Sequence, residues 1–253
     1  MSNDVPPLQF NFVSLFPEVI TPYMESGVVG RAIQRSLINV DAVTFRDFAQ
    51  GNYRSVDDVP FGGGPGVVIQ AEPVALAIDS LQNAGKKIML SPNGKPFTQQ
   101  DAQRLSQEPA ITFICGRYEG IDARLQIEYV DEVFSVGDYV LSGGELPALM
   151  IADAITRLIP GVLNNADSSL FESHCDEMDF LLEHPHYTRP AIWRGHSVPD
   201  VLLSGHHARI EAWRRDASFK LTAQVRPDLF KKISLNPKDR ARIQQLLKED
   251  ELL

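Results

Sequence analysis

The sequence predicts an α/β protein with a mainly parallel sheet, followed by a small helical domain. Strand-like and helix-like segments alternate over the first two thirds of the 253 residues, which is the pattern of a parallel sheet with crossover helices. Residues 204–253 show helical patterns only. The length allows one large domain or two smaller ones and is ample for a hydrophobic core.

The predicted strands are short segments that either alternate apolar and polar residues or are continuously apolar. Residues 8–15 alternate, whereas residues 110–115 form the apolar run AITFIC, which is typical of a buried parallel strand. The predicted strands, in chain order, are 8–15, 39–46, 86–91, 110–115 and 127–136.

The predicted helices combine apolar residues at helical spacing with recognisable end signals. Pro73 stands near the start of one helix, and Pro147 opens another that stops at Pro160. Thr98 with Asp101 three residues later forms an imperfect capping box. The predicted helices are one whose entry is bracketed by Pro17 and Pro22, then 28–37, 72–84, 98–107 and 147–159.

Polarity and charge divide the chain into three parts. Residues 161–183 are polar, lack periodicity and predict a flexible linker between a domain at 1–160 and a helical domain at 184–253. The net charge is −9, but residues 1–183 hold 11 Lys and Arg against 25 Asp and Glu, a balance of −14. Residues 184–253 hold 13 against 8, a balance of +5. This asymmetry favours a basic surface for nucleic acid, the alternative being a solvated helical surface.

Several protein classes are excluded by what the sequence lacks. No stretch approaches the ~20 apolar residues of a membrane span, and the N-terminus has no secretory signal. Cys115 and Cys175 are too few for a disulfide framework or a four-cysteine zinc site, so a reduced, cytoplasmic protein is expected. His184, His186 and the His206-His207 pair lie outside any zinc motif and are read as surface or RNA-facing residues.

Three glycine-bearing segments stand at strand ends or turns and predict a ligand site. They are residues 61–66, 115–120 and 135–147. Glycine lets backbone N–H and C=O groups approach a ligand closely, and ligands of open α/β sheets bind at the carboxyl ends of strands. Plain turn chemistry is the alternative for any one of these loops.

The familiar nucleotide and hydrolase motifs are absent. There is no phosphate-binding P-loop, no dinucleotide fingerprint and no Gly-x-Ser-x-Gly elbow. Residues 141–145, LSGGE, mimic the signature of ABC-type ATPases. A nucleotide-hydrolysing protein is therefore one alternative, although it lacks a phosphate loop.

Taken together, these segments resemble the bacterial tRNA (guanine-N1)-methyltransferases of the TrmD family, in the SPOUT superfamily. The resemblance covers nearly the whole chain, and several of the matching segments are long and specific to the family. They are residues 14–17, 47–54, 60–66, 90–92, 116–122, 136–145, 185–190 and 202–207.

The resemblance implies a trefoil-knotted α/β domain, a homodimer with its active site at the subunit interface, and S-adenosylmethionine as methyl donor. It implies that the substrate is the guanine at position 37 of tRNA, next to the anticodon. The donor-binding residues that it implies are Leu90, Ser91, Pro92, Gly116, Glu119, Gly120, Val136, Gly137, Asp138, Tyr139, Val140, Leu141, Gly143, Gly144 and Pro147.

Methyl transfer to guanine N1 requires removal of the N1 proton or stabilisation of negative charge on O6, or both. By resemblance, Arg157 would stabilise O6, although a cation at a helix C-terminus also complements the helix dipole. The base falls on Glu172, where the family usually has Asp, in a segment about three residues longer than is typical. Asp176 and then Asp179 are the alternatives.

The basic C-terminal domain would bind the tRNA backbone. Its candidate phosphate contacts are Arg189, Arg194, Arg209, Arg214, Arg215, Lys220, Arg226, Lys231 and Lys232. Trp193 or Trp213 could stack on a base, the alternative being a core position. The resemblance makes Mg²⁺ plausible, with Glu119 as candidate carboxylate. A non-catalytic RNA-binding protein that keeps the fold is the second alternative, since Glu172 and its segment depart from the family pattern.

Overall fold

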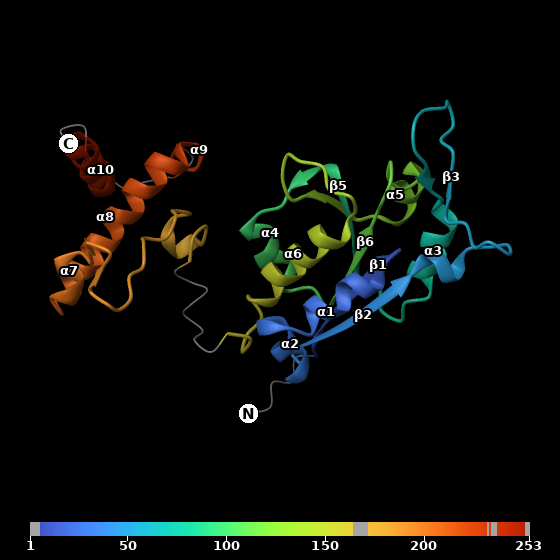
Figure 1. Cartoon of the computed structure of the whole chain (residues 1–253), viewed down its shortest axis with the longest axis horizontal. Coiled ribbons are helices and arrows are strands. Elements are labelled where there is room, and N and C mark those ends of the chain that lie inside the picture. Colours follow the sequence, from blue (N-terminus) through green and yellow to red (C-terminus); the bar gives the residue numbers. More distant parts are fainter. Residues whose placement is uncertain (1–5, 164–171, 232, 234–236, 251–253) are drawn as a thin grey trace. The chain divides into compact units, whose positions relative to one another are not determined.

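The computed structural model describes residues 6–163, 172–231, 233 and 237–250. The chain divides into two compact units, Met1–Asn164 and Asn165–Leu253. Each unit is described by itself, and Figure 1 labels their helices and strands.

The first unit is built on a five-stranded sheet in the order β2-β1-β6-β5-β7. Every pairing in this sheet is parallel, which confirms the predicted α/β class. The strands are β1 (Leu8–Ser14), β2 (Ile38–Thr44), β5 (Lys86–Pro96), β6 (Ala110–Cys115) and β7 (Glu132–Ser135).

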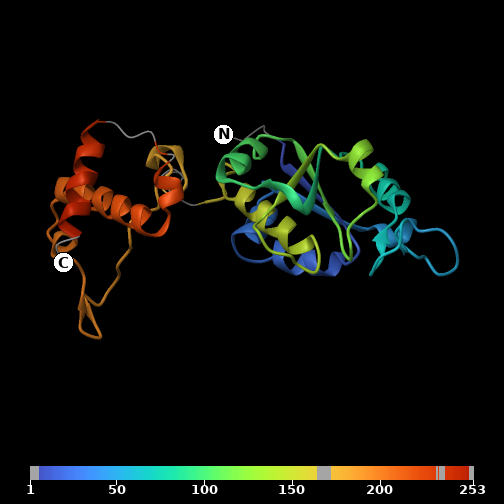
Figure 2. The ribbon, with the colours of Figure 1, turned by 90° about the horizontal axis from the view of Figure 1, so that it is seen from above.

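Helices cover both faces of this sheet (Figures 1 and 2). Because side chains alternate along a strand, Phe10 and Phe12 of β1 enter one core, whereas Val13 enters the other. The helices against the first core are α1 (Ile20–Met24), α2 (Gly27–Gln34), α4 (Gln99–Leu105) and α6 (Glu145–Thr156). The second core is covered by α3 (Ala71–Asp79), α5 (Ala123–Tyr129) and the 3-10 helix η2 (Phe45–Phe48).

The strand predicted at 127–136 is wrong in its first part, because residues up to Tyr129 belong to helix α5. The Asp122 side chain caps this helix by accepting a hydrogen bond from the Arg124 backbone N–H at 2.9 Å. Leu125 and Tyr129, one turn apart, both pack into the second core. Only Glu132–Ser135 forms a strand.

Strand β5 is longer than predicted and contains an irregularity. It pairs with β7 through Leu90, and the pairing resumes at Lys95 after a register shift. The residues between them, including Ser91 and Pro92, therefore leave the regular ladder. At Gly94 an added Cβ would lie 2.5 Å from the Phe134 carbonyl carbon, so only glycine allows this close approach of the two strands.

The segment between η2 and α3 carries a small hairpin of β3 (Asp57–Asp58) and β4 (Val68–Ile69). Two exposed aromatic side chains lie in this segment, Tyr53 before β3 and the fully exposed Phe61 in the loop between the two strands. At the helix entry predicted between Pro17 and Pro22, the 3-10 helix η1 (Pro17–Val19) leads directly into α1.

The second unit is a small helical bundle with a hairpin. Its elements are η4 (Asp176–Met178), β8 (Ile192–Trp193), β9 (His196–Ser197), α7 (Asp200–Leu203), α8 (His207–Val225), α9 (Pro227–Phe230) and α10 (Pro237–Asp250). Its core consists of Leu181, Phe219, Ile243 and Leu246. In the described part of the chain, no helix combines the length and apolar character needed to cross a bilayer.

Residues 172–183, which the sequence assigns to the linker, are folded onto the second unit. Leu181 is completely buried there, and Cys175 is 1% exposed. The backbone N–H of Leu182 donates to Thr222 Oγ1 of α8 at 2.9 Å, and that of Glu183 donates to Ser173 Oγ at 2.9 Å. The linker residues 164–171 lie outside the described residues.

Candidate functional site

A cavity of about 270 Å³ lies at the carboxyl ends of three neighbouring strands, β5, β6 and β7. The loops after these strands converge because the carboxyl ends of parallel strands meet at one edge of the sheet. The cavity is lined by Leu90, Ser91, Pro92, Gly116, Arg117, Tyr118, Glu119, Gly120, Phe134, Ser135, Val136, Gly137, Tyr139, Val140, Leu141, Ser142, Gly143, Gly144 and Pro147.

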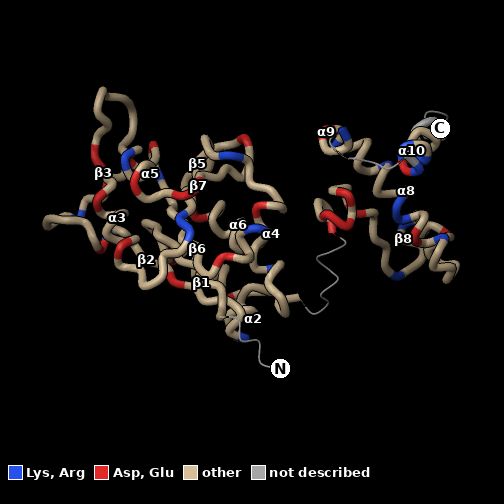
Figure 3. The backbone as a smooth tube through the Cα atoms, turned by 180° about the vertical axis from the view of Figure 1, so that it is seen from behind, with Lys and Arg blue, Asp and Glu red and all other residues tan. Residues whose placement is uncertain are grey.

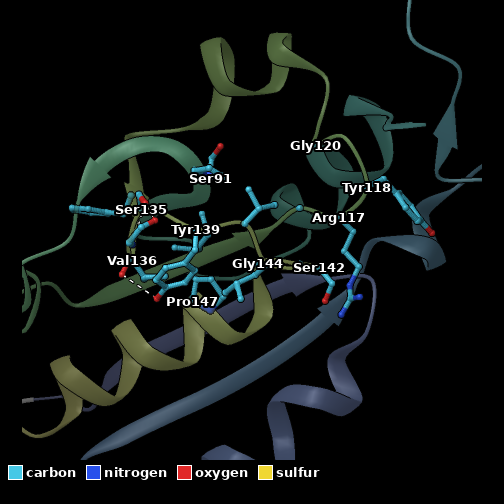
Figure 4. Close-up of a pocket in the computed structure, with 18 of the residues that line it drawn as sticks. Ser91, Arg117, Tyr118, Gly120, Ser135, Val136, Tyr139, Ser142, Gly144 and Pro147 are labelled. Atoms are coloured by element: carbon cyan, nitrogen blue, oxygen red, sulfur yellow. Dashed lines mark hydrogen bonds between the residues drawn. The ribbon is translucent and has the colours of Figure 1, made fainter. Parts of the chain in front are cut away.

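Backbone hydrogen bonds hold the loops of this cavity together. The Gly144 N–H donates to the Gly116 carbonyl at 2.9 Å, and Arg117 pairs with Gly143 in an isolated antiparallel bridge. In Figure 4, Arg117 and Ser142 lie at one end of the cavity, and Val136 and Tyr139 lie at the other. There the Tyr139 hydroxyl donates to the Val136 carbonyl at 3.3 Å. These bonds fix the positions of the loops relative to one another.

Two glycines are required by this close packing. A Cβ on Gly144 would lie 2.9 Å from Cys115 Cα and 3.1 Å from the Gly116 nitrogen, which are backbone atoms that cannot turn aside. A Cβ on Gly143 would lie 2.4 Å from Glu145 Oε2. Glycine thus lets the loop before α6 reach the end of β6.

All the predicted donor-site residues except Asp138 line this one cavity. The sequence did not single out Arg117, Tyr118, Phe134, Ser135 and Ser142, although each lies within or next to a glycine-bearing loop. The remaining loop, 61–66, is absent from the lining but reaches it indirectly. A Cβ on Gly66 would lie 2.5 Å from Glu119 Oε1.

A buried carboxylate supports the cavity from behind. Glu145, the first residue of α6, is 1% exposed. Its Oε1 accepts hydrogen bonds from Ser14 Oγ at 2.7 Å and from Arg117 Nε at 3.1 Å. The Arg117 guanidinium also lies over the Phe16 ring, 4.4 Å from its centroid. Glu145 therefore joins the end of β1, the loop after β6 and the start of α6.

Replacing Glu145 with Ala is expected to lower the free energy of unfolding by about 2 kcal/mol. The substitution leaves the Ser14 hydroxyl and the partly buried Arg117 guanidinium without this acceptor, and an unsatisfied buried polar group costs ~1–3 kcal/mol. Urea unfolding followed by circular dichroism measures the change.

The matched control is Glu72→Ala, because Glu72 is an exposed carboxylate in the first turn of another helix, α3. This control is expected to stay within about 0.5 kcal/mol of the parent protein. Equal losses in the two variants would contradict the role given to Glu145.

The cysteines are not nucleophiles in this structure. Cys115 is fully buried at the end of β6, and burial, with a further contribution from the Glu145 charge, raises the pKa of its thiol well above the usual value. Burial also raises the pKa of Cys175. Thiolate is the reactive form of cysteine, so neither side chain supplies a nucleophile near neutral pH.

The residues predicted for catalysis are placed in different units. Arg157 is the exposed C-cap residue of α6 in the first unit. Glu172 is half-buried in the second unit, where its carbonyl accepts a hydrogen bond from the Cys175 N–H. Asp176 is exposed at the start of η4, whereas the Asp179 carboxylate is ion-paired with Arg215. The Asp179 carboxylate thus helps to hold its own segment to α8.

Three of the basic residues predicted for tRNA binding are held in ion pairs. Arg215 pairs with both Asp179 and Asp239, Arg214 pairs with Glu211 at 2.7 Å, and Arg226 pairs with Asp228 at 2.8 Å. The exposed members are Arg214 and, besides it, Arg189, Arg194, Arg209 and Lys231. Lys and Arg positions along α8 are blue in Figure 3. Lys232 lies outside the described residues, and Lys220 is treated below.

Among the described residues, one group of possible metal ligands satisfies close geometry. It consists of Glu183, His184 and His186, whose ligand atoms all lie within 4.8 Å of one another. His186 Nε2 lies 2.8 Å from Glu183 Oε1, and this contact is an ion pair only when the imidazole is protonated. Glu119 is not part of any such group in the described residues.

Comparison with known proteins identifies close relatives over most of the chain. A family model described as tRNA (Guanine-1)-methyltransferase TrmD matches residues 8–232. A protein of Albidiferax ferrireducens is 49% identical over 227 residues, which are 88% of this chain and 92% of that protein. One of Lactobacillus delbrueckii subsp. bulgaricus is 46% identical over 244 residues, covering 96% and 97%. One of Mycoplasmopsis agalactiae is 48% identical over 228 residues, covering 90% and 99%. All three relatives are named tRNA (guanine-N(1)-)-methyltransferase.

Proposed function

The chain belongs to the tRNA (guanine-1)-methyltransferase family and is an enzyme of that class, and from this premise we propose that it transfers a methyl group from S-adenosylmethionine to N1 of guanine 37 in tRNA. The observation that carries the proposal is the single cavity at the carboxyl ends of β5, β6 and β7, in which the glycine-rich loops meet. The proposal includes the trefoil knot and the cytoplasmic location implied for this family.

The lining of the cavity fits the donor. Apolar side chains such as Leu90, Val136 and Leu141 can hold an adenine ring, and the main-chain groups of the glycine loops can bind its polar edge and the ribose hydroxyls. A volume of about 270 Å³ is near the lower end of the ~300–1,000 Å³ typical of small-molecule sites. When bound, S-adenosylmethionine supplies an electrophilic methyl group, and the bond pair of its S–CH₃ bond returns to sulfur.

The protein's own groups act on the guanine. Glu172 accepts the N1 proton, which leaves an electron pair on N1 free to form the new N–CH₃ bond. Arg157 donates hydrogen bonds to O6, where negative charge develops as the proton leaves. Glu has the same acid–base chemistry as the Asp that is usual in the family, with one more methylene of reach.

A homodimer with its active site at the subunit interface is part of the proposal. In the first unit, large apolar side chains of α6 face solvent, with Leu146 55% and Met150 52% exposed. Tyr23 on α1 and the neighbouring Val140 and Leu141 are also exposed. An apolar surface of this kind is typical of a protein–protein interface, and a second copy of the chain is the proposed partner.

For Mg²⁺ we propose Glu119 alone as protein ligand. Mg²⁺ commonly keeps several waters and takes one or two carboxylates, so a single carboxylate in the cavity wall is compatible with it. Transfer of a methyl group from a sulfonium requires no metal in principle.

The direct test is methyl transfer from radiolabelled S-adenosylmethionine to an unmodified tRNA transcript that has guanine at position 37. The expected product is 1-methylguanosine at that position, and a transcript with adenosine 37 is the control. Donor binding and tRNA binding without any transfer would overturn the proposal and favour a non-catalytic RNA-binding protein.

Salt dependence tests the second unit as the tRNA-binding surface. The tRNA affinity is expected to fall with rising salt, and Arg209→Ala is expected to reduce the slope of log K against log salt by about one. Arg215→Ala is the matched control, because the Arg215 guanidinium is held by two carboxylates of its own unit. Its slope is expected to stay unchanged. Fluorescence anisotropy of labelled tRNA from 50 to about 200 mM salt measures both slopes, and an unchanged slope for Arg209→Ala would contradict the assignment.

A further inference from the structure

A second cavity, of about 370 Å³, lies along α8 in the second unit. On the helix, Trp213, Ala217 and Gln224 follow one another at spacings of four and seven residues, so they share one face. The cavity is lined by Pro185, Trp213, Asp216, Ala217, Lys220, Leu221, Gln224 and Leu246. None of these residues lines the donor cavity of the first unit.

Trp213 is not a core residue. The core of the second unit is formed by Leu181, Phe219, Ile243 and Leu246, with Phe230 and Ile233 packed against it. Trp213 is only partly buried and lines the cavity instead. This excludes the core alternative that the sequence left open for this side chain.

Other aromatic rings gather around Trp213 at the surface. The rings of His184 and Tyr187 each lie 6.2 Å from the indole, and His186 lies 4.6 Å from His184. Tyr187 is 48% exposed, so the cluster is accessible to a ligand. A cluster of aromatic rings at the surface does not serve to fill a hydrophobic core. Proteins that bind RNA stack its unpaired bases on aromatic side chains of this kind.

The polar side chains of the cavity match the edge of a base and its phosphate. Gln224 is exposed and offers both an amide donor and a carbonyl acceptor. Lys220 adds a positively charged side chain to the lining. Asp216 is fixed by Arg242, whose Nη2 lies 2.5 Å from Asp216 Oδ2, so its negative charge is balanced. The aromatic wall and this polar edge together have the character of a nucleobase site.

Trp193 is the less suitable platform. It lies on the β8–β9 hairpin and is 59% exposed, but the Arg194 guanidinium lies 4.9 Å from the centroid of its ring. One face of that indole is therefore covered by its neighbour, and neither of the two cavities described above has Trp193 in its lining.

We propose that the cavity beside Trp213 binds one unpaired base of the tRNA substrate, with the indole as stacking surface and Gln224 at the polar edge of the base. This inference rests on the proposed tRNA-binding role of the second unit. It goes beyond that role because it assigns a base-binding site, distinct from the site where guanine 37 is methylated.

The test is a double-mutant cycle on the full-length protein. The Kd of a tRNA with guanine 37 is measured for the parent protein and for Trp213→Ala, with intact tRNA and with tRNAs that each lack one unpaired base. Trp213→Ala is expected to raise the Kd of intact tRNA roughly 5- to 150-fold, since one stacked base contributes about 1–3 kcal/mol. For one abasic tRNA, the same substitution is expected to cause no further loss.

Control variants separate stacking from damage to the unit. Trp213→Phe keeps a stacking surface and is expected to restore most of the affinity. Val225→Ala removes an exposed apolar side chain at the end of the same helix and is expected to leave the Kd unchanged. Circular dichroism confirms that each variant is folded.

Three results would overturn the proposal. The first is an unchanged Kd for Trp213→Ala, and the second is a loss that adds fully to that of every abasic tRNA. The third is coupling between an abasic position and Trp193→Ala but not Trp213→Ala, which would place the base on the hairpin. Methylation by the parent protein is assayed in parallel, so that failure of the proposed reaction is seen separately from failure of the base site.

Discussion

Replacing Glu172 with Gln is expected to lower the single-turnover rate of methyl transfer by about 10²- to 10⁴-fold. The amide keeps the size and polarity of the side chain but cannot accept the N1 proton, and general-base catalysis contributes a factor of this order. The backbone around Glu172 is held by the Cys175 N–H and by the folded segment that follows it. Glu172 is not in the lining of the donor cavity, so donor affinity should not change.

Asp176→Asn and Asp179→Asn are the matched controls, because they remove the other two candidate carboxylates. Asp176→Asn is expected to keep the parent rate. Asp179→Asn is expected to weaken the ion pair with Arg215 and so lower stability, with little effect on the rate of the folded enzyme. If Asp176→Asn abolishes transfer and Glu172→Gln does not, the base is Asp176 and the assignment of Glu172 is wrong.

Arg157→Ala is expected to lower the same rate by about 10²- to 10³-fold, which corresponds to about 3–4 kcal/mol of transition-state stabilisation. The reason is that the substitution removes the donor proposed for the developing charge on O6. Arg157 lies at the exposed C-terminal end of α6, so its truncation is not expected to disturb the core. Rapid-quench measurement of labelled methyl in tRNA gives the rate.

Arg157→Lys distinguishes hydrogen bonding from charge alone. Lys keeps the positive charge but lacks the planar, multiple donors of guanidinium, so it is expected to recover only part of the rate. The exposed Arg31 on α2 provides a control, because Arg31→Ala removes a surface charge of the same unit outside the donor cavity. A normal rate for Arg157→Ala would contradict the proposed role.

The elements that the sequence predicted well are those whose signals are local. Residues 110–115 form strand β6 with the predicted bounds, because a short, mainly apolar run rich in β-branched residues suits a fully buried strand. Thr98 and Asp101 make both hydrogen bonds of a capping box, so this helix start is stronger than its sequence indicated. The errors in the predicted elements occur where contacts with residues far away in the chain determine the secondary structure. Helix α5 is stabilised by packing of Leu125 and Tyr129 into the second core.

For the site, the sequence identified the loops but not the support behind them. Glycines mark the loops after β6 and β7, since main chain can approach a ligand only where side chains are absent. Glu145 was included in the segment 135–147 and in the misleading LSGGE motif but was given no role, because nothing local shows that its carboxylate is buried against Ser14 and Arg117. Likewise, Arg215 has the sequence signature of a phosphate contact, yet it pairs with Asp179 and Asp239.

The sequence by itself determined the α/β class, most of the elements, the contrast of charge between the two parts of the chain and, through its motifs, the family. These properties depend on residue type and on spacings of a few residues. Only the tertiary structure decided that three loops form one cavity, that Trp213 lies outside the core and that residues 172–183 fold onto the second unit. The physical reason is that burial, ion pairing and the order of strands in a sheet arise from contacts between residues far apart in the chain.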